Sequence, residues 1–236
     1  MAYQALYRKY RPQLFADVLG QEHITTTLKN QVESGRVSHA YVFSGSRGTG
    51  KTTTAKILAR AVNCAHPVNG EPCGECEYCL AAADCEHPEN GDPCGTCDTC
   101  RALAEENSLD ILEIDAASNN GVDDVRAIID KARFTPLKLK KKVYIIDEAH
   151  MLSRPAFNAL LKTLEEPPEH VLFILATTEP QSIPATILSR CQRFDFHRIG
   201  VEDIISCVRS AVNKAGAEID DEGLLVIARA AEGGMR

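Results

Sequence analysis

The 236-residue sequence has no run of about 18 consecutive apolar residues, no apolar leader core near Met1 and no excess of basic charge. A membrane-spanning helix needs about 20 apolar residues, so we expect a cytoplasmic protein without membrane contact. The net charge of −7 argues against a uniformly basic nucleic-acid-binding coat, although it leaves room for a local basic surface. The length suits one large α/β domain, or one domain with a small second one.

What the sequence does contain is a glycine-rich stretch between an apolar run at 39–44 and a helical pattern at 52–63. Gly45, Gly50, Lys51 and Thr52 have the spacing GxxxxGK[ST], which is that of a phosphate-binding P-loop. Glycine lets backbone N–H groups curve around phosphate oxygens, and the helix N-terminus adds positive dipole character. We therefore predict a nucleoside triphosphate site that comprises Gly45, Ser46, Gly48, Thr49, Gly50, Lys51, Thr52 and Thr53.

A second apolar run, at 142–147, ends in Asp147 and Glu148. Open α/β sheets bind ligands at the carboxyl ends of their strands, so both carboxylates should face the P-loop. We expect Asp147 and the Thr52 hydroxyl to hold Mg²⁺, Lys51 to reach the β- and γ-phosphates, and Glu148 to act as general base for the attacking water. A further apolar run, at 171–176, delivers short polar residues that could contact the γ-phosphate.

Ten cysteines are present, and eight of them form a tandem repeat. Residues 85–100 repeat residues 64–79 at an offset of 21, with ten of sixteen positions identical. Each copy holds four cysteines, enough for a tetrahedral Zn²⁺ site, whereas disulfides and iron–sulfur clusters fit this setting less well. We predict two structural zinc ions, with His66 and His87 outside both sites; the ligands are Cys64, Cys73, Cys76 and Cys79 for the first and Cys85, Cys94, Cys97 and Cys100 for the second.

The remaining pattern alternates strands with helices, which predicts an α/β fold with a parallel sheet covered on both faces. Strands are expected at 39–44, 109–115, 142–147, 171–176 and 193–196. After about residue 199 only helical patterns follow, at 201–215 and 220–231. We therefore predict a nucleotide-binding domain at 1–199, with the cysteine insertion at 64–100, and the start of a small helical lid domain at 200–236.

Taken together, these motifs resemble the N-terminal part of the γ/τ subunits of bacterial DNA polymerase III, the ATPase motors of the sliding-clamp loader. Besides the P-loop, the resemblance rests on residues 7–12, 20–23, 63–64, 113–118, 146–148, 157–170, 187–191 and 230–236. It covers the whole chain and implies an AAA+ fold with an inserted Cys₄ zinc module. It also implies ATP and Mg²⁺ as cofactors, and as partners the other clamp-loader subunits, the sliding clamp and primer–template DNA held through its phosphates.

The resemblance also assigns roles that spacing alone does not. Arg11, Pro12, Val18 and Leu19 would line the adenine pocket. Thr178 would be the residue that senses the γ-phosphate, with Thr177 as its rival. Arg190 would reach the ATP of an adjacent subunit as an arginine finger, and Arg236 would contact the γ-phosphate from the lid.

One feature departs from the family, whose members carry a single four-cysteine module. The block from Leu80 to Cys100 is an added copy, and an exchange of ligands between the copies is an open alternative. The leading hypothesis for function is an ATP-hydrolysing motor that opens the sliding clamp and loads it onto primed DNA during replication. The alternatives are a non-hydrolysing scaffold subunit of the same assembly and a zinc-dependent adaptor.

Overall fold

A computed structural model of the chain describes residues 11–76, Cys79, 110–136 and 139–235. Five parallel strands form one sheet in the order β2-β3-β4-β1-β5. All five predicted strands are present, with ends that differ from expectation by at most two residues. Their bounds are Ala40–Ser44 (β1), Ile111–Asp115 (β2), Lys142–Asp147 (β3), Val171–Thr177 (β4) and Gln192–Asp195 (β5).

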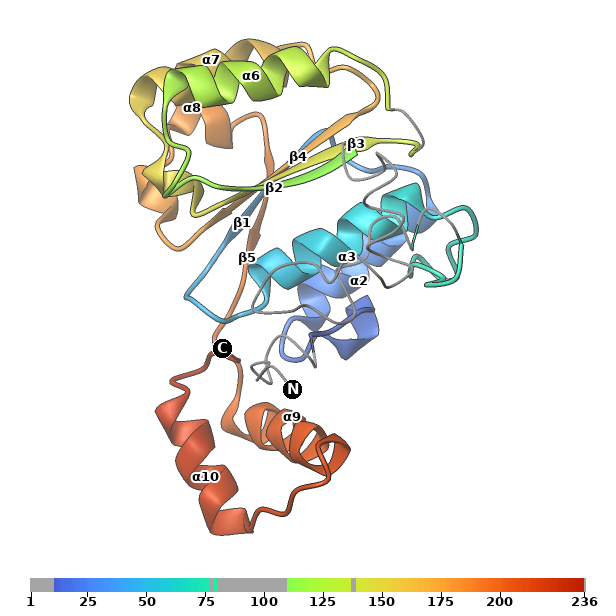
Figure 1. Cartoon of the computed structure of the whole chain (residues 1–236), viewed down its shortest axis with the longest axis vertical. Helices are drawn as coiled ribbons and strands as arrows, with labels where there is room; N and C mark the ends of the chain where they lie inside the picture. Colours follow the sequence, from blue (N-terminus) through green and yellow to red (C-terminus); the bar gives the residue numbers. More distant parts are fainter. Residues whose placement is uncertain (1–10, 77–78, 80–109, 137–138, 236) are drawn as a thin grey trace.

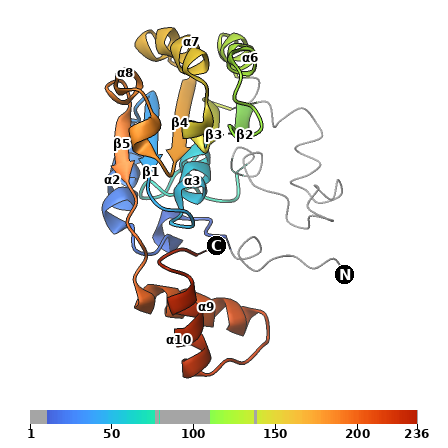
Figure 2. The ribbon, with the colours of Figure 1, turned by 90° about the vertical axis from the view of Figure 1, so that its left-hand side faces the viewer.

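Helices cover both faces of the sheet, as Figures 1 and 2 show. One face carries α2 (Glu22–Glu33) and α3 (Lys51–Asn63), and the other carries α6 (Val122–Ala132), α7 (Arg154–Glu165) and α8 (Ala185–Leu188). Among the described residues, every helix is too short or too polar to cross a lipid bilayer.

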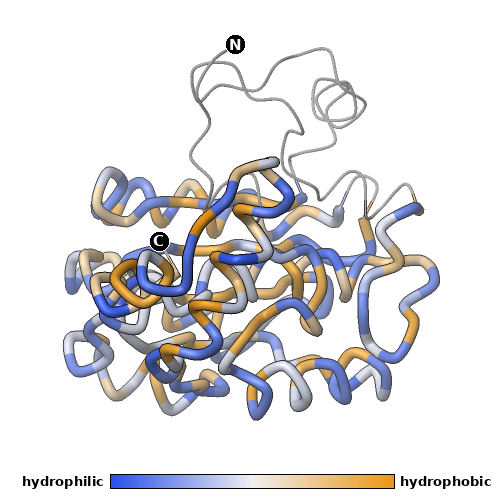
Figure 3. The backbone as a smooth tube through the Cα atoms, turned by 90° about the horizontal axis from the view of Figure 1, so that it is seen from below, coloured by the Kyte–Doolittle hydropathy of each residue, from blue (hydrophilic) through white to orange (hydrophobic). Residues whose placement is uncertain are grey.

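Successive side chains of the central strands point to opposite faces of the sheet, so the core has two layers. Tyr41 and Phe43 of β1 pack with α2 and α3, whereas Ala40 and Val42 face the layer that contains α6 and α7. Strands β1 and β4 are buried along their whole length, as is usual for parallel strands with helices on both faces. Hydrophobic stretches accordingly run through the interior in Figure 3, while the outer helical turns alternate between hydrophobic and hydrophilic residues.

The strand order decides where the motifs meet. Strands β3, β4 and β1 are neighbours, and Ser44 at the end of β1 lies in register with Thr177 at the end of β4. The P-loop follows β1, the two carboxylates follow β3, and the threonine pair ends β4. All three segments therefore leave the same edge of the sheet at adjacent positions, as parallel topology requires.

Local signals fix several helix ends. The Ser153 hydroxyl accepts a hydrogen bond from the Ala156 N–H at 3.3 Å and caps α7, with Pro155 in the first turn. Gly35 follows α2 with φ 67°, the left-handed conformation that commonly ends helices. Both ends therefore depend on a few adjacent residues.

Two further helices, α9 (Val201–Lys214) and α10 (Asp221–Ala230), lie outside the layers of the sheet (Figure 1). They share a small core of Ile199, Ile204 and Ala228. The segment after α10 returns to the P-loop, where the Met235 N–H donates to the Gly48 carbonyl at 2.9 Å. We call α9, α10 and this segment the lid; its division from the rest at residue 200 stays a prediction.

Candidate functional site

A cavity of about 580 Å³ opens between the sheet edge and the lid. Three segments form its walls: the P-loop, the lid, and residues 11–19, which we call the arm. The cavity brings together most of the residues predicted to bind nucleotide. Those that line it are Arg11, Pro12, Val18, Leu19, Gly48, Thr49, Gly50, Lys51, Thr52, Thr53, Asp147 and Glu148.

The P-loop depends on glycine at two positions. Gly45 has φ 149°, and a Cβ atom there would lie 2.5 Å from the Phe196 carbonyl oxygen, so no side chain fits. Gly50 has φ 98° and is the N-cap residue of α3. These conformations direct the loop into the first turn of α3, where unpaired N–H groups are available to an anion.

Lys51 lies at the base of the loop with 7% of its surface exposed. Its Nζ donates to the carbonyl oxygens of Gly45 at 2.9 Å and Ser46 at 2.8 Å. The loop therefore curves around the ammonium group, which places a fixed positive charge beside the N–H groups of the P-loop. Gly45 and Ser46 thus belong to the site through their carbonyl groups.

Thr52 and Asp147 meet directly, although 95 residues separate them in the sequence. The Thr52 hydroxyl donates to Asp147 Oδ2 at 3.0 Å, while the Glu148 N–H donates to Asp147 Oδ1 at 3.0 Å. A hydroxyl and a carboxylate oxygen at hydrogen-bond distance are the hard donors that Mg²⁺ prefers. The donor set of Thr52 and Asp147 therefore fits a magnesium ion.

Glu148 has φ 47°, a left-handed conformation that is uncommon outside glycine and is found at functional sites. Its Oε2 accepts a hydrogen bond from the Thr178 hydroxyl at 3.4 Å. Thr177 is fully buried, and its hydroxyl instead pairs with His150 Nδ1 at 3.1 Å and the Glu179 N–H at 3.0 Å. The two threonines thus have different surroundings. Of their two hydroxyl groups, only that of Thr178 forms a hydrogen bond with Glu148.

The resemblance assigns two further arginines to nucleotide sites, and the structure describes one of them. Arg190 does not line the cavity; it forms an ion pair with Glu165 at 2.6 Å and donates to the Thr186 carbonyl at 2.6 Å. Its side chain is 32% exposed. Arg236 lies outside the described residues, although its neighbour Met235 lines the cavity.

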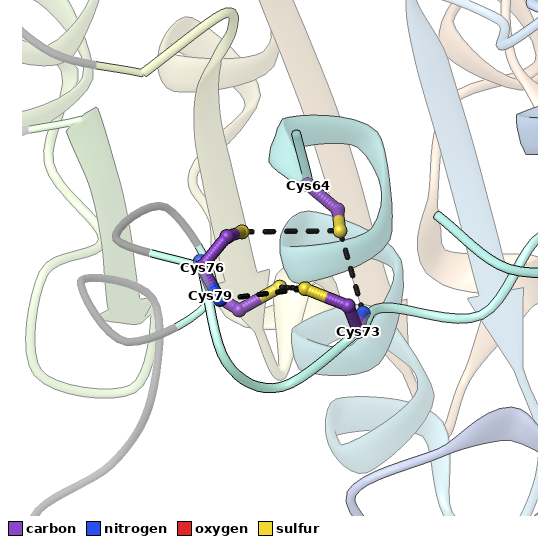
Figure 4. A group of neighbouring side chains, drawn as sticks. All are labelled: Cys64, Cys73, Cys76 and Cys79. Atoms are coloured by element: carbon purple, nitrogen blue, oxygen red, sulfur yellow. Dashed lines mark hydrogen bonds between the residues drawn. The ribbon is translucent and has the colours of Figure 1, made fainter. Parts of the chain in front are cut away.

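The first cysteine set forms a cluster at the end of α3 (Figure 4). All four Sγ atoms lie within 4.8 Å of one another, and the pairs Cys73–Cys79 and Cys64–Cys76 are each 3.9 Å apart. Tetrahedral zinc with Zn–S bonds of about 2.3 Å places its sulfurs about 3.8 Å apart, so the cluster fits the ion.

Backbone N–H groups also point at these sulfurs. The N–H groups of Ala65 and Cys79 donate to Cys76 Sγ at 3.5 and 3.4 Å. Burial raises the pKa of the Cys76 thiol, but these hydrogen bonds and those of neighbouring thiols outweigh it and lower the pKa to about 6. Hydrogen bonds of this kind favour the thiolate form that binds metal. The second set, Cys85, Cys94, Cys97 and Cys100, lies outside the described residues.

Several features of the site are contacts that the sequence does not predict. Gln21 is fully buried, and its side-chain amide forms two hydrogen bonds with the backbone of His197, at the start of the connection to the lid. Glu71 and Arg60 contact the arm across long sequence separations. Cys207 is half-buried and lines the cavity. No local pattern marks these contacts, because each pairs distant segments.

Solved structures with the same fold include the Thermotoga maritima RuvB Holliday junction branch migration motor. It is 19% identical with a TM-score of 0.62, and the match covers 96% of this chain and 61% of that chain. A point-substituted form of the same RuvB gives a TM-score of 0.63 at 19% identity, over 96% of this chain and 61% of that chain. At this identity the likeness establishes the fold, an AAA+-like α/β arrangement, and nothing more.

Among curated proteins, the subunit tau of DNA polymerase III from Bacillus subtilis is 54% identical over 236 residues, 100% of this chain and 38% of its own length. The Escherichia coli subunit tau is 47% identical over 100% of this chain and 33% of its own length. The chain therefore spans about a third of the length of these relatives.

A family model described as "DNA polymerase III, delta subunit" matches residues 20–90 and 80–200. The two matches overlap at residues 80–90, inside the duplicated cysteine segment. The description of the model names a delta subunit, whereas the relatives that align over the whole chain are tau and gamma subunits. The alignments over the whole chain favour the tau and gamma subunits over the delta subunit. The chain belongs to this DNA polymerase III family, and within it is similar over its whole length to the N-terminal region of the tau/gamma subunits.

Proposed function

We propose that this chain is the ATP-binding and ATP-hydrolysing part of a clamp-loader motor subunit of DNA polymerase III. The observation that carries the proposal is the contact between Thr52 and Asp147 at 3.0 Å, beside Lys51 in a cavity of about 580 Å³. A cavity of this volume suits a nucleotide, and its polar groups gather at the P-loop end.

Each of the three segments that form the cavity would bind a different part of the nucleotide. The P-loop N–H groups and Lys51 bind the phosphates, and Thr52 and Asp147 hold Mg²⁺, which neutralises charge that develops on the phosphate oxygens. Arg11, Pro12, Val18 and Leu19 enclose the adenine from the arm side. Met235 and its neighbours close the cavity from the lid, which supports a γ-phosphate contact for Arg236.

Glu148 would orient the attacking water and accept its proton. Thr178 contacts Glu148 and is therefore favoured over Thr177 as the residue that senses the γ-phosphate, because the Thr177 hydroxyl is engaged with His150 and Glu179. A hydrogen bond to the carboxylate keeps it in one orientation until nucleotide and water arrive.

Arg190 would act in trans. Its partly exposed position outside the cavity supports a role at the site of a neighbouring subunit rather than at its own. An arginine supplied by a neighbour stabilises transition-state charge and makes hydrolysis depend on assembly. The partners would be the other clamp-loader subunits, the sliding clamp and primer–template DNA bound through its phosphates in the bacterial cytoplasm.

The cysteine cluster would hold one structural zinc ion, and the second cysteine set a second ion. Four sulfur ligands leave no open position for water or substrate, so the cluster stabilises the fold and takes no part in the chemistry. The alternative functions, a non-hydrolysing scaffold or a zinc-dependent adaptor, are disfavoured because Lys51, Thr52, Asp147 and Glu148 are all present and gathered at one cavity.

The test is ATP turnover by the full-length protein assembled with its partner subunits, with and without clamp and primed DNA. Lys51→Ala should abolish turnover, and Arg190→Ala should lower the stimulated rate by about 10³-fold. Arg209→Ala is a matched control, since Arg209 forms a similar exposed ion pair with Asp221 at 2.6 Å in the lid. An inactive wild-type assembly would favour the scaffold, and stimulation that survives Arg190→Ala would refute the trans role.

A further inference from the structure

The loop that carries the cysteines is seated against α2. Asn69 and Gly70 have φ 51° and 74° and form a tight turn, flanked by paired hydrogen bonds between Val68 and Glu71. A Cβ atom at Gly70 would lie 2.3 Å from the Lys29 carbonyl oxygen, so the backbone of the turn touches the backbone of α2. This contact places Glu71, two residues before Cys73, over the arm.

Glu71 binds the arm with both carboxylate oxygens. Its Oε2 accepts from the Phe15 N–H at 2.7 Å, and its Oε1 accepts from the Ala16 N–H at 3.0 Å. Lys29 lies 3.5 Å from Oε1, and the Glu71 side chain is only 15% exposed. Two hydrogen bonds to one shielded carboxylate fix the backbone of the 3₁₀ helix η1 (Phe15–Asp17) in both position and direction.

The segment fixed in this way continues directly into the cavity. Asp17, Val18 and Leu19 line the cavity, and a Cβ atom at Gly50 of the P-loop would lie 3.7 Å from Val18. The other anchor of the arm is Arg60 in the last turn of α3, which donates to the Gln13 carbonyl at 2.6 Å. Both anchors adjoin the cysteine cluster, since Cys64 directly follows α3 and Glu71 lies two residues before Cys73.

We propose, resting on the proposed nucleotide function, that Glu71 is a positioning residue through which the four-cysteine loop holds the base-side wall of the nucleotide cavity. The loop is closed by its metal ligands, Cys64 and Cys73, on either side of Glu71. Closing the loop fixes the carboxylate, the carboxylate fixes η1, and η1 places Val18 and Leu19. Metal binding and nucleotide binding are therefore thermodynamically coupled through one side chain.

The proposal predicts which part of the nucleotide is affected. The arm forms the base side of the cavity, whereas phosphates are bound by the P-loop, which Glu71 does not touch in the structure. Glu71→Gln keeps the shape and one acceptor oxygen but turns an NH₂ group toward the second N–H. We expect it to weaken ATP binding about 10-fold, as for the loss of one charge-assisted hydrogen bond, and to leave inorganic tripolyphosphate binding unchanged.

The experiment is calorimetric titration of the zinc-loaded chain with ATP and with tripolyphosphate, both with Mg²⁺. Glu75→Gln is the matched control, because Glu75 is an exposed glutamate in the same loop. Removing zinc with a chelator should weaken ATP binding to wild type about as much as Glu71→Ala does. In the Glu71→Ala variant, removing zinc should weaken ATP binding no further. Tripolyphosphate binding by each sample verifies that its P-loop is folded.

Three outcomes would overturn the coupling: Glu71→Gln that binds ATP as tightly as wild type, equal losses for ATP and tripolyphosphate, or a chelator effect that persists in Glu71→Ala. Failure of the proposed function has a different signature, since wild type itself would then bind neither ligand.

Discussion

The two threonines at the end of β4 offer the sharpest test of the site, because the same substitution at adjacent positions should have opposite consequences. Thr177→Val removes a fully buried hydroxyl and, with it, the hydrogen bonds to the Glu179 N–H and to His150 Nδ1, which also lies 3.6 Å from Glu148 Oε2. A buried polar group without its hydrogen bond costs about 1–3 kcal/mol. We therefore expect a loss of folding stability in this range, with Glu148 still oriented by Thr178.

Thr178→Val removes only a long hydrogen bond of 3.4 Å from a half-buried residue, so folding stability should fall by less than about 0.5 kcal/mol. Glu148, however, loses the hydroxyl that orients its carboxylate. A general base contributes about 10²–10⁴-fold to rate, and partial loss of its orientation should lower ATP turnover about 10–100-fold.

Urea denaturation of each variant measures the first quantity, and ATP turnover by the full-length assembly measures the second. The reasoning is refuted if Thr178→Val turns over ATP at the wild-type rate while Thr177→Val is stable and slow. That pattern would make Thr177 the γ-phosphate sensor and the contact between Thr178 and Glu148 incidental.

Three further predictions concern other parts of the site. Gly45→Ala should lower the free energy of unfolding by about 2 kcal/mol or more in urea titrations, because its Cβ would lie 2.5 Å from the Phe196 carbonyl oxygen. Gln21→Ala removes both side-chain hydrogen bonds to the backbone of His197; we expect a stability loss of about 1–3 kcal/mol and weaker ATP binding by calorimetry, since Gln21 follows the arm closely and ties that part of the chain to the connection into the lid. Burial raises the pKa of the Cys207 thiol, so its thiolate fraction is low at neutral pH; its alkylation, located by mass spectrometry, should be slow, should accelerate as pH rises, and should be blocked by ATP.

The sequence predicts those parts of the fold whose signals are local. Short runs that are apolar or alternate in polarity locate all five strands, and Ser153 and Gly35 mark helix ends because capping depends on a few adjacent residues. Helix α8 is only four residues long, Ala185–Leu188, and Arg190 and Cys191 follow it in tight turns. The spacing of its glycines, lysine and threonine is enough to predict the P-loop.

The sequence does not predict contacts that join distant segments. Glu71 and Phe15 are 56 residues apart, and neither belongs to a periodic pattern. Only the family resemblance assigned Arg11, Pro12, Val18 and Leu19 to the nucleotide pocket, and all four line the cavity. The arm is irregular apart from η1, so tertiary hydrogen bonds place it, and periodicity carries no information about them.

The duplicated cysteine segment allows a last prediction, on which copy supports the cavity. In the first copy the turn contains Asn69, Gly70 and Glu71, whereas the second copy has Asn90, Gly91 and Asp92. Aspartate is shorter than glutamate by one carbon–carbon bond, about 1.5 Å, and a carboxylate held back by that distance cannot reach both N–H groups of η1. The contact therefore requires the first copy.

Two deletions of 21 residues test this requirement, because each leaves a chain with one complete copy at the same spacing from α3. Deleting residues 80–100 should lower bound zinc from two ions to one and leave ATP affinity unchanged. Deleting residues 64–84 should lower zinc equally but weaken ATP binding about 10-fold, since Asp92 then occupies the place of Glu71. Adding Asp92→Glu to this second deletion should restore the affinity. If both deletions bind ATP equally, or the added glutamate restores nothing, the carboxylate is not what ties the cysteine loop to the nucleotide cavity.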